Sequence, residues 1–388
     1  MADPPARQPA IAALGTWSGG RFLHFGEAIA EERLVDLLRP DQRLDTVLTA
    51  DVYGAGDADR LLALALAGAR REDVCVIGAI GHDFYDGERQ GAKGFPRFTD
   101  PALRGPSEYA GYLRMATERS LERCGIDRFD VLLLHNPDRI GYTSEAVWEA
   151  MAALRDAGLT SAIGVAPGPA NGFTLDVIGC FERFGALIDW AMLILGPLEP
   201  WPGELALRAA SAADVKVIAR VVDYGGLFWG DVHAGHPFRA DDHRVFRPAG
   251  WVEAGLERIE MMRPLAERHG VTPLQLACAW DLAHPAVSCV VPTLIQESGA
   301  NARPIEDKRA ELAALPRERL LDDDEVALIR GLGDNTGCMA LKGAAPDHEG
   351  AERPDRWEIA EAQLALAARW KIDPDTDLRQ HAAQLAGR

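Results

Sequence analysis

The stretch RLDTVLTADVYGAGDADRLLALAL, residues 43–66, reads as a strand, a glycine-flanked turn and an amphipathic helix in succession. The run LDTVLTA (44–50) predicts the strand, and the residues after the turn have helical periodicity. Between them, Gly54 and Gly56 mark a tight turn that presents Tyr53. A strand followed by a helix is the repeating unit of parallel α/β folds, so the number of such units decides the fold.

Seven further strand-like runs alternate with helix-sized segments along the chain. They are IAALGTW (11–17), VCVIGAI (74–80), VLLLH (131–135), SAIGVA (161–166), WAMLIL (190–195), VKVIARVV (215–222) and VSCVVP (287–292). Eight strand–helix units predict a closed (β/α)8 (TIM) barrel over residues 1–340. An open doubly wound sheet is disfavoured, because no GxGxxG follows the first strand. Residues 341–388 are predicted to form a C-terminal extension with one helix.

Composition excludes several classes of partner. The net charge of −18 over 388 residues argues against nucleic-acid or membrane binding and leaves a small-molecule substrate, in a monomer or a homo-oligomer. No apolar run reaches the roughly 18 residues of a membrane span, and the start MADPPARQPAIAALGTW lacks a signal-peptide segment. The six cysteines form no CxxC pair and several sit in apolar runs, as expected for free buried thiols. We therefore expect a cytoplasmic protein.

Three side chains at the ends of predicted strands are candidates for catalysis. In a (β/α)8 barrel the carboxyl ends of the strands and the loops after them carry the chemistry. Tyr53, His135 and His82 follow the second, fourth and third predicted strands, respectively. Lys93, in the loop GAKGFPRF, is a further candidate if that loop returns to the site.

Several motifs, in order and spacing, resemble the aldo-keto reductase superfamily. They are LGTWSGG, TADVYGAGDADRLLALALAG, ATERSLERCGIDRFDVLLLHNPD, EAMAALRDAGLTSAIGV and GVTPLQLACAWDLAHPAVSCVVP. The likeness runs from about residue 9 to 335, and LLLHNPDRIGY is similar to the aldose-dehydrogenase-like branch. The resemblance implies reduction of a carbonyl with NADPH, or the reverse oxidation. It also implies that Tyr53 donates the proton and that His135 orients the carbonyl.

Two positions depart from the family pattern together. The family's aspartate, five residues before the tyrosine, is Leu48, and its lysine on the third strand is Ala79. Losing both leaves no buried unpaired charge. An apolar wall beside Tyr53 should hold its pKa near or above the reference value of about 10. His135, with a reference pKa of about 6.5, would then be the better base.

The positions that bind the nucleotide in the family also differ in this sequence. The resemblance assigns to the nucleotide Gly15, Trp17, Arg220, Gly225, Leu227 and Arg303. Arg220 stands where the family has a stacking aromatic residue, and Lys308 and Arg309 are further candidates to meet a phosphate. Ala166 and Pro167 replace the pair that binds the carboxamide and offer it no side-chain partner. We therefore expect NADP binding to be weak or lost.

The long loop 223–251 contains the spacing HxxH followed by DDH, together with several aromatic residues. It has no rigid helical spacing of ligands, so a polar lid is favoured over a metal site.

Three functions stay open at this point. The first is an oxidoreductase acting on a carbonyl or alcohol of a small sugar-like or aromatic compound. The second is a redox-neutral lyase, dehydratase or isomerase that uses Tyr53 and His135 as acid and base without a nicotinamide. The third is a non-catalytic binding or regulatory subunit, because a fold does not fix a function.

Overall fold

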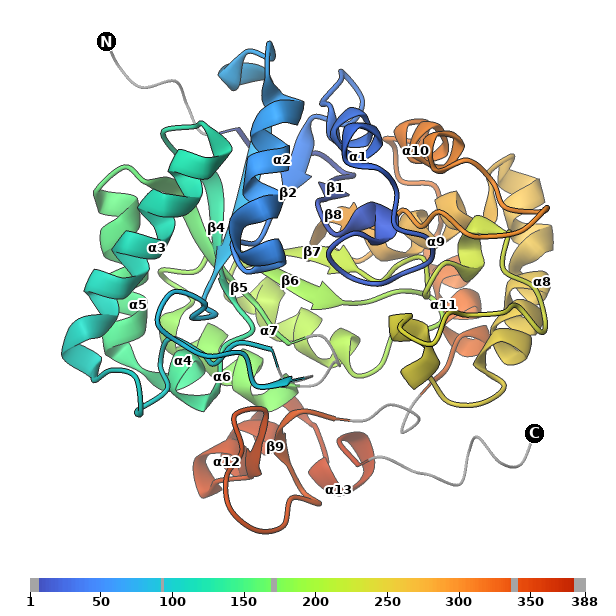
Figure 1. Cartoon of the computed structure of the whole chain (residues 1–388). Coiled ribbons are helices and arrows are strands. Elements are labelled where there is room, and N and C mark those ends of the chain that lie inside the picture. Colours follow the sequence, from blue (N-terminus) through green and yellow to red (C-terminus); the bar gives the residue numbers. More distant parts are fainter. Residues whose placement is uncertain (1–6, 92–93, 169–172, 336–340, 380–388) are drawn as a thin grey trace.

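Eight parallel strands lie side by side in sequence order and form the centre of the computed structural model (Figure 1). The structure describes residues 7–91, 94–168, 173–335 and 341–379. A parallel bridge between Ala12 and Val290 joins the first strand to the last, so the sheet closes on itself. The strands are β1 (Leu14–Gly15), β2 (Thr46–Leu48), β3 (Cys75–Ile80), β4 (Phe129–His135), β5 (Thr160–Ala166), β6 (Trp190–Ile194), β7 (Lys216–Arg220) and β8 (Val287–Val291).

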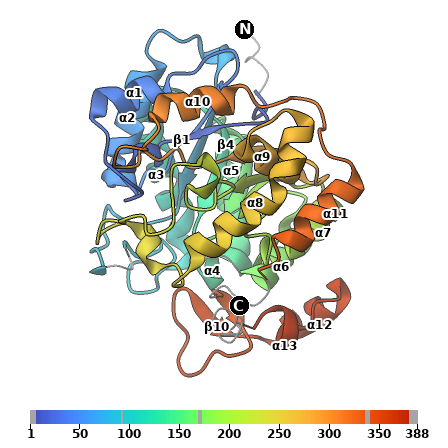
Figure 2. The same cartoon turned by 90° about the vertical axis from the view of Figure 1, so that its right-hand side faces the viewer.

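Helices surround the barrel, and more than one follows some strands (Figures 1 and 2). The predicted (β/α)8 barrel is confirmed, although β1 and β2 are shorter than the runs 11–17 and 44–50. The helices are α1 (Glu31–Leu38), α2 (Asp57–Leu66), α3 (Tyr109–Cys124), α4 (Arg139–Thr143), α5 (Glu145–Asp156), α6 (Thr174–Phe184), α7 (Leu207–Ala212), α8 (Trp251–His269), α9 (Pro273–Leu282), α10 (Ile305–Ala313) and α11 (Asp323–Leu332). None of the described helices is long and apolar enough to cross a membrane.

The core has two layers because side chains alternate along each strand. On β3, Cys75, Ile77 and Ala79 point into the barrel, whereas Val76 and Ile80 pack against the helices. The five cysteines within the described residues, Cys75, Cys124, Cys180, Cys278 and Cys289, are buried and free; Cys338 lies outside them.

The C-terminal extension packs beneath α4 and α6 in both views (Figures 1 and 2). The expectation of one helix was incomplete. The extension contains α12 (Glu361–Trp370), the short α13 (Pro374–Asp377) and a parallel pair of strands, β9 (Gly343–Ala345) and β10 (Arg356–Glu358). Three-residue strands carry too little periodicity to be recognised in sequence.

One buried carboxylate anchors this extension to the barrel. Asp176, in the first turn of α6, accepts hydrogen bonds from the backbone N–H of Ala344 at 2.9 Å, from Trp357 Nε1 at 3.1 Å and from Gln363 Nε2 at 2.8 Å. The three donors come from β9, β10 and α12, so a single side chain holds every part of the extension except α13.

Candidate active site

Tyr53 and His135 meet at the carboxyl end of the barrel. Tyr53 begins the 3-10 turn Tyr53–Gly56, in which Gly54 and Gly56 have φ of 60° and 99°, so the glycines are required for the turn. Its ring lies edge-to-face on that of His135, with centroids 5.8 Å apart, and 6.2 Å from the ring of Trp17. The strand–turn–helix unit at 43–66 thus presents Tyr53 to the end of β4.

The wall beside Tyr53 is apolar. Leu48 and Ala79 are buried in the interior layer of the barrel, and Tyr53 packs against the same cluster. Burial raises the pKa of Tyr53 to about 12, and the nearby Arg220 guanidinium offsets only part of that effect. The direction agrees with the sequence-based expectation, so Tyr53 is a neutral phenol at physiological pH.

His135 ends β4 and is buried, with only 6 % of its surface exposed. Its Nδ1 has no hydrogen-bond partner among the described residues. Burial and the charges of Arg97 and Arg220 lower the pKa of His135 to about 3. The lowered pKa argues against the expectation that His135 is the better base: burial opposes its protonation most, and the charges of Arg97 and Arg220 add to that effect.

His82 is buried beside His135. The two ring centroids are 5.1 Å apart, and His82 Nε2 lies 2.9 Å from the side-chain amide nitrogen of Asn136. Burial lowers the pKa of His82 well below its usual range, and Arg97 adds to the effect. His82 thus belongs to the mouth of the barrel and is not a solvated loop residue. Lys93 lies outside the described residues.

Arg97 is a site residue that the sequence analysis missed. It lies in the loop between β3 and α3, and an antiparallel bridge pairs it with His82. Its Nη1 donates to His82 Nδ1 at 3.0 Å and its Nε donates to the backbone carbonyl of Asn136. The one available signal was a lone arginine between aromatic residues in FPRF.

Arg220 ends β7 and completes the mouth. Its Nη2 donates to the carbonyls of Pro167 and Gly168 at 3.0 and 2.9 Å, while its buried Nε has no partner among the described residues. The next residue, Val221, has φ of 66°, which is rare for a β-branched side chain. Strain of this kind is retained where the surrounding structure fixes it, often at functional sites.

The predicted nucleotide residues divide into two groups. Gly15 and Trp17 lie at the mouth, where a Cβ on Gly15 would come within 2.4 Å of the Trp17 ring. Trp17 Nε1 donates to Thr293 Oγ1 at 3.3 Å. Gly225 and Leu227 lie in the loop after β7, where Leu227 is buried.

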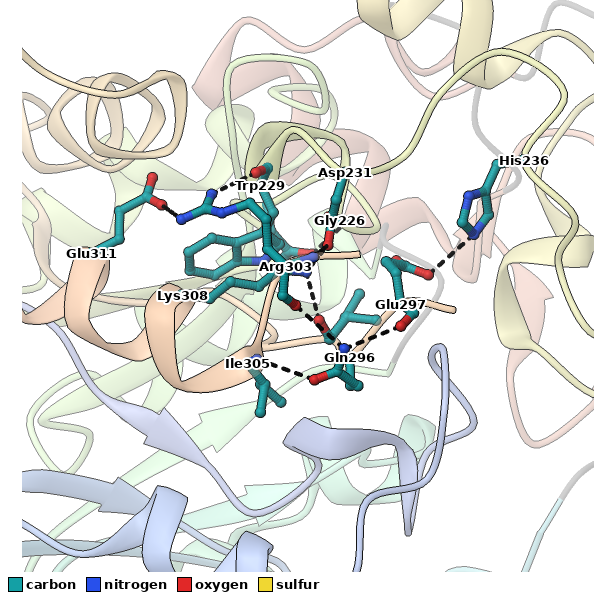
Figure 3. A network of polar contacts seen from close by, with 12 residues as sticks. Gly226, Trp229, Asp231, His236, Gln296, Glu297, Arg303, Ile305, Lys308 and Glu311 are labelled. Atoms are coloured by element: carbon teal, nitrogen blue, oxygen red, sulfur yellow. Dashed lines mark hydrogen bonds and ion pairs between the residues drawn. The ribbon is translucent and has the colours of Figure 1, made fainter. Parts of the chain in front are cut away.

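Beyond that loop, a polar network joins it to the segment after β8 (Figure 3). Lys308 forms a buried ion pair with Asp231 at 2.7 Å and donates to the carbonyl of Ile295 at 2.6 Å. Arg303 donates to the carbonyl of Trp229 and to Glu311, both at 2.7 Å.

Charged residues of loop 223–251 also form ion pairs within the chain. Arg244 is 1 % exposed and pairs with Asp242 at 2.8 Å and with Glu297 at 2.5 Å. It also donates to the carbonyl of Gly225 at 3.1 Å. His236 lies 3.2 Å from Glu297, a contact that Figure 3 also draws. These pairs tie the loop to the segment after β8.

The fold class of this protein is a (β/α)8 barrel, with Tyr53 and His135 at its mouth. Comparison with known proteins gives the family. The aldo/keto reductase family profile matches residues 13–332, so the chain belongs to that family of oxidoreductases.

Among curated relatives, a "Probable voltage-gated potassium channel subunit beta" of Arabidopsis thaliana is 24 % identical over 305 residues, covering 74 % of this chain and 85 % of that protein. A 6-dehydroglucose reductase of Agrobacterium fabrum is 24 % identical over 257 residues, covering 65 % and 73 %.

Solved structures share the fold. A glycerol dehydrogenase from Gluconobacter oxydans superposes with a TM-score of 0.64 at 21 % identity, covering 86 % of this chain and 95 % of that one. An aldo/keto reductase from Klebsiella pneumoniae, in complex with NADP and acetate, gives a TM-score of 0.52 at 21 % identity, covering 83 % and 90 %.

Proposed function

We propose that this protein acts on a carbonyl or alcohol of a small sugar-like or aromatic compound, with Tyr53 as proton donor and His135 orienting the carbonyl oxygen. The observation that carries the proposal is the contact between the two rings at the mouth of the barrel, 5.8 Å between centroids. In a reduction, hydride transfer from a nicotinamide nucleotide would convert the carbonyl into an alkoxide. A neutral phenol can donate a proton to that oxygen, and a neutral imidazole can donate a hydrogen bond to it. The high pKa of Tyr53 favours protonation of a carbonyl over deprotonation of an alcohol.

We infer further that nicotinamide nucleotide binding is weak or absent. The three basic residues that the sequence offered to a phosphate all have partners within the chain. Lys308 and Arg303 pair with Asp231 and Glu311, respectively, and Arg309 donates to Asp41 and to backbone carbonyls of residues 37 and 39. A phosphate would have to displace these contacts.

The same network supports a second candidate function. A redox-neutral lyase, dehydratase or isomerase would need the acid at Tyr53 and no nucleotide. For that reaction, the contacts of Asp231 with Lys308 and Arg303 would have a structural role only: they join loop 223–251 to α10 and the segment before it.

One experiment tests the assignment of Tyr53. The purified protein is assayed against a panel of aldehydes, ketones and sugars, with and without NADPH. Tyr53→Phe should lower turnover by about two orders of magnitude. Tyr109→Phe is the matched control, because its buried hydroxyl makes only a 3.5 Å contact with the carbonyl of Thr99. Equal turnover by the wild type and Tyr53→Phe would exclude Tyr53 as the acid. No turnover of any substrate would favour the non-catalytic role.

A fluorescence titration with NADPH tests the expected weak nucleotide binding and the redox-neutral candidate. Weak binding that Arg303→Ala leaves unchanged is expected, because Arg303 is already held by Trp229 and Glu311. Submicromolar affinity, or a tenfold loss in Arg303→Ala, would show that the network opens to admit the nucleotide and would remove the case for the redox-neutral reaction.

A further inference from the structure

Two arginines at the mouth have no carboxylate partner among the residues that the structure describes. Arg220 donates to the carbonyls of Pro167 and Gly168, and its buried Nε has no partner within the described part of the chain. Arg97 donates to the carbonyls of Asn136 and Phe95 and to His82. All of these acceptors are neutral, so no side chain of the described segments neutralises either positive charge in a direct ion pair.

Three other buried or half-buried arginines are paired differently. Arg104 donates to Asp83, Arg244 to Asp242 and Glu297, and Arg247 to Glu199. A buried charge without an opposite charge is destabilising, which explains that pairing. Arg97 and Arg220 at the mouth differ, because no carboxylate of the described residues pairs with them.

Backbone geometry places both guanidinium groups around the same pair of residues. His135 pairs with Ala166 across β4 and β5. Arg97 donates to the carbonyl of Asn136, which follows His135, and Arg220 donates to the carbonyl of Pro167, which follows Ala166. The two cations thus approach the His135–Ala166 pair from the β3 loop and from the end of β7.

Charge at this point suits an anion. The small cavity beside Arg220 is lined also by Pro167, Gly168 and Ile194 but not by Arg97 or His135, so it marks only the Arg220 side of this region. Burial lowers the pKa of Arg97 and of Arg220, as expected for cations that lack an adjacent anion. Arginine presents its donors in a planar fork that matches a carboxylate.

We propose that Arg220 and Arg97 recognise a carboxylate on the substrate, next to the carbonyl that Tyr53 would protonate. The inference rests on the proposed function and narrows its substrate class to small anionic carbonyl compounds such as 2-oxo acids. An incoming carboxylate would supply the negative charge that the mouth lacks.

Calorimetry on the wild-type protein tests this without any variant. The probes are phenylglyoxylate and its methyl ester, which share the ring and the ketone and differ in charge. Charge-assisted hydrogen bonds to two arginines should make the acid bind about tenfold to a hundredfold more tightly than the ester. Equal affinity for the two probes, or binding of neither, would overturn the proposal.

Variants of the two arginines then test which of them binds the carboxylate. Arg220→Gln and Arg97→Gln should each reduce acid binding by about tenfold and leave ester binding unchanged, whereas Arg220→Lys should keep part of the preference. Arg114→Gln, which removes an exposed partner of Glu118, is the control and should behave as the wild type. An undiminished acid preference in both glutamine variants would contradict the assignment.

The proposed function and this inference can fail separately. Tyr53→Phe should keep the wild-type preference for phenylglyoxylate over its methyl ester, since both probes carry the ketone that Tyr53 contacts and differ only in charge. If the acid is preferred but Tyr53→Phe retains full turnover, the role of Tyr53 is wrong and the anion site stands. If Tyr53→Phe loses turnover of neutral carbonyls while acid and ester bind equally, only the anion site is wrong.

Discussion

Asp231 and Lys308 form an ion pair of 2.7 Å between two side chains that are 1 % and 0 % exposed. Asp231 comes from the loop after β7, and Lys308 comes from α10. The pair therefore joins two segments far apart in the sequence and removes from solvent a cation that the family resemblance offered to a phosphate.

Breaking this pair should destabilise the fold. Asp231→Asn leaves the Lys308 ammonium buried without its opposite charge, and we expect the free energy of unfolding to fall by about 3–5 kcal/mol in urea denaturation. Glu260→Gln, which breaks the exposed pair with Arg263, should change it by less than about 1 kcal/mol. A similar small effect for both variants would mean that water reaches Lys308.

The tyrosine at the mouth should ionise only in strong alkali. Difference absorbance between wild type and Tyr53→Phe should show a phenol midpoint near pH 12, because burial beside Leu48 and Ala79 disfavours the phenolate and Arg220 offsets only part of that effect. The double variant Leu48→Asp/Ala79→Lys should move that midpoint down, since a cation favours the phenolate. A wild-type midpoint near 7 would show a basic group close to Tyr53.

His135 should make the fold sensitive to acid. Its folded pKa of about 3 is below the unfolded value of 6.5, so its neutral form stabilises the protein fully above pH 6.5, and that contribution is lost as the pH falls toward 3. The shift corresponds to roughly 4–5 kcal/mol. His135→Gln should flatten the pH dependence of unfolding over this range. His269→Gln, at a half-buried surface position, is the comparison, and equal slopes in both variants would contradict the shift.

Asp176 should control docking of the C-terminal extension. Asp176→Ala removes three hydrogen bonds and leaves the donors of Ala344 and Trp357 buried and that of Gln363 half-buried, so we expect the free energy of unfolding to fall by about 2–4 kcal/mol. Limited proteolysis should then cut within 341–379 before the barrel unfolds. Asp375→Ala, at an exposed position, is the control. Cleavage at wild-type rates would mean that apolar contacts alone hold the extension.

The strand–helix alternation could be read from the sequence because it is local. A period of two in strands and 3.6 in helices is encoded residue by residue, and eight such units close into a barrel. The meeting of Tyr53 and His135 followed from the same argument, because the carboxyl ends of all the strands share one face. The apolar wall of Leu48 and Ala79 followed from their places on adjoining strands.

Tertiary structure alone decided which charges are paired. Arg303 and Lys308 look available in sequence, yet folding brings Glu311 and Asp231, respectively, to them. Arg97 looked like an ordinary loop residue, yet the β3 loop returns it to His82. Sequence periodicity determines which face of an element is buried. It does not determine which distant polar groups will share a site from which water is excluded. Burial in that site, together with the nearby Arg97 and Arg220, lowers the pKa of His135.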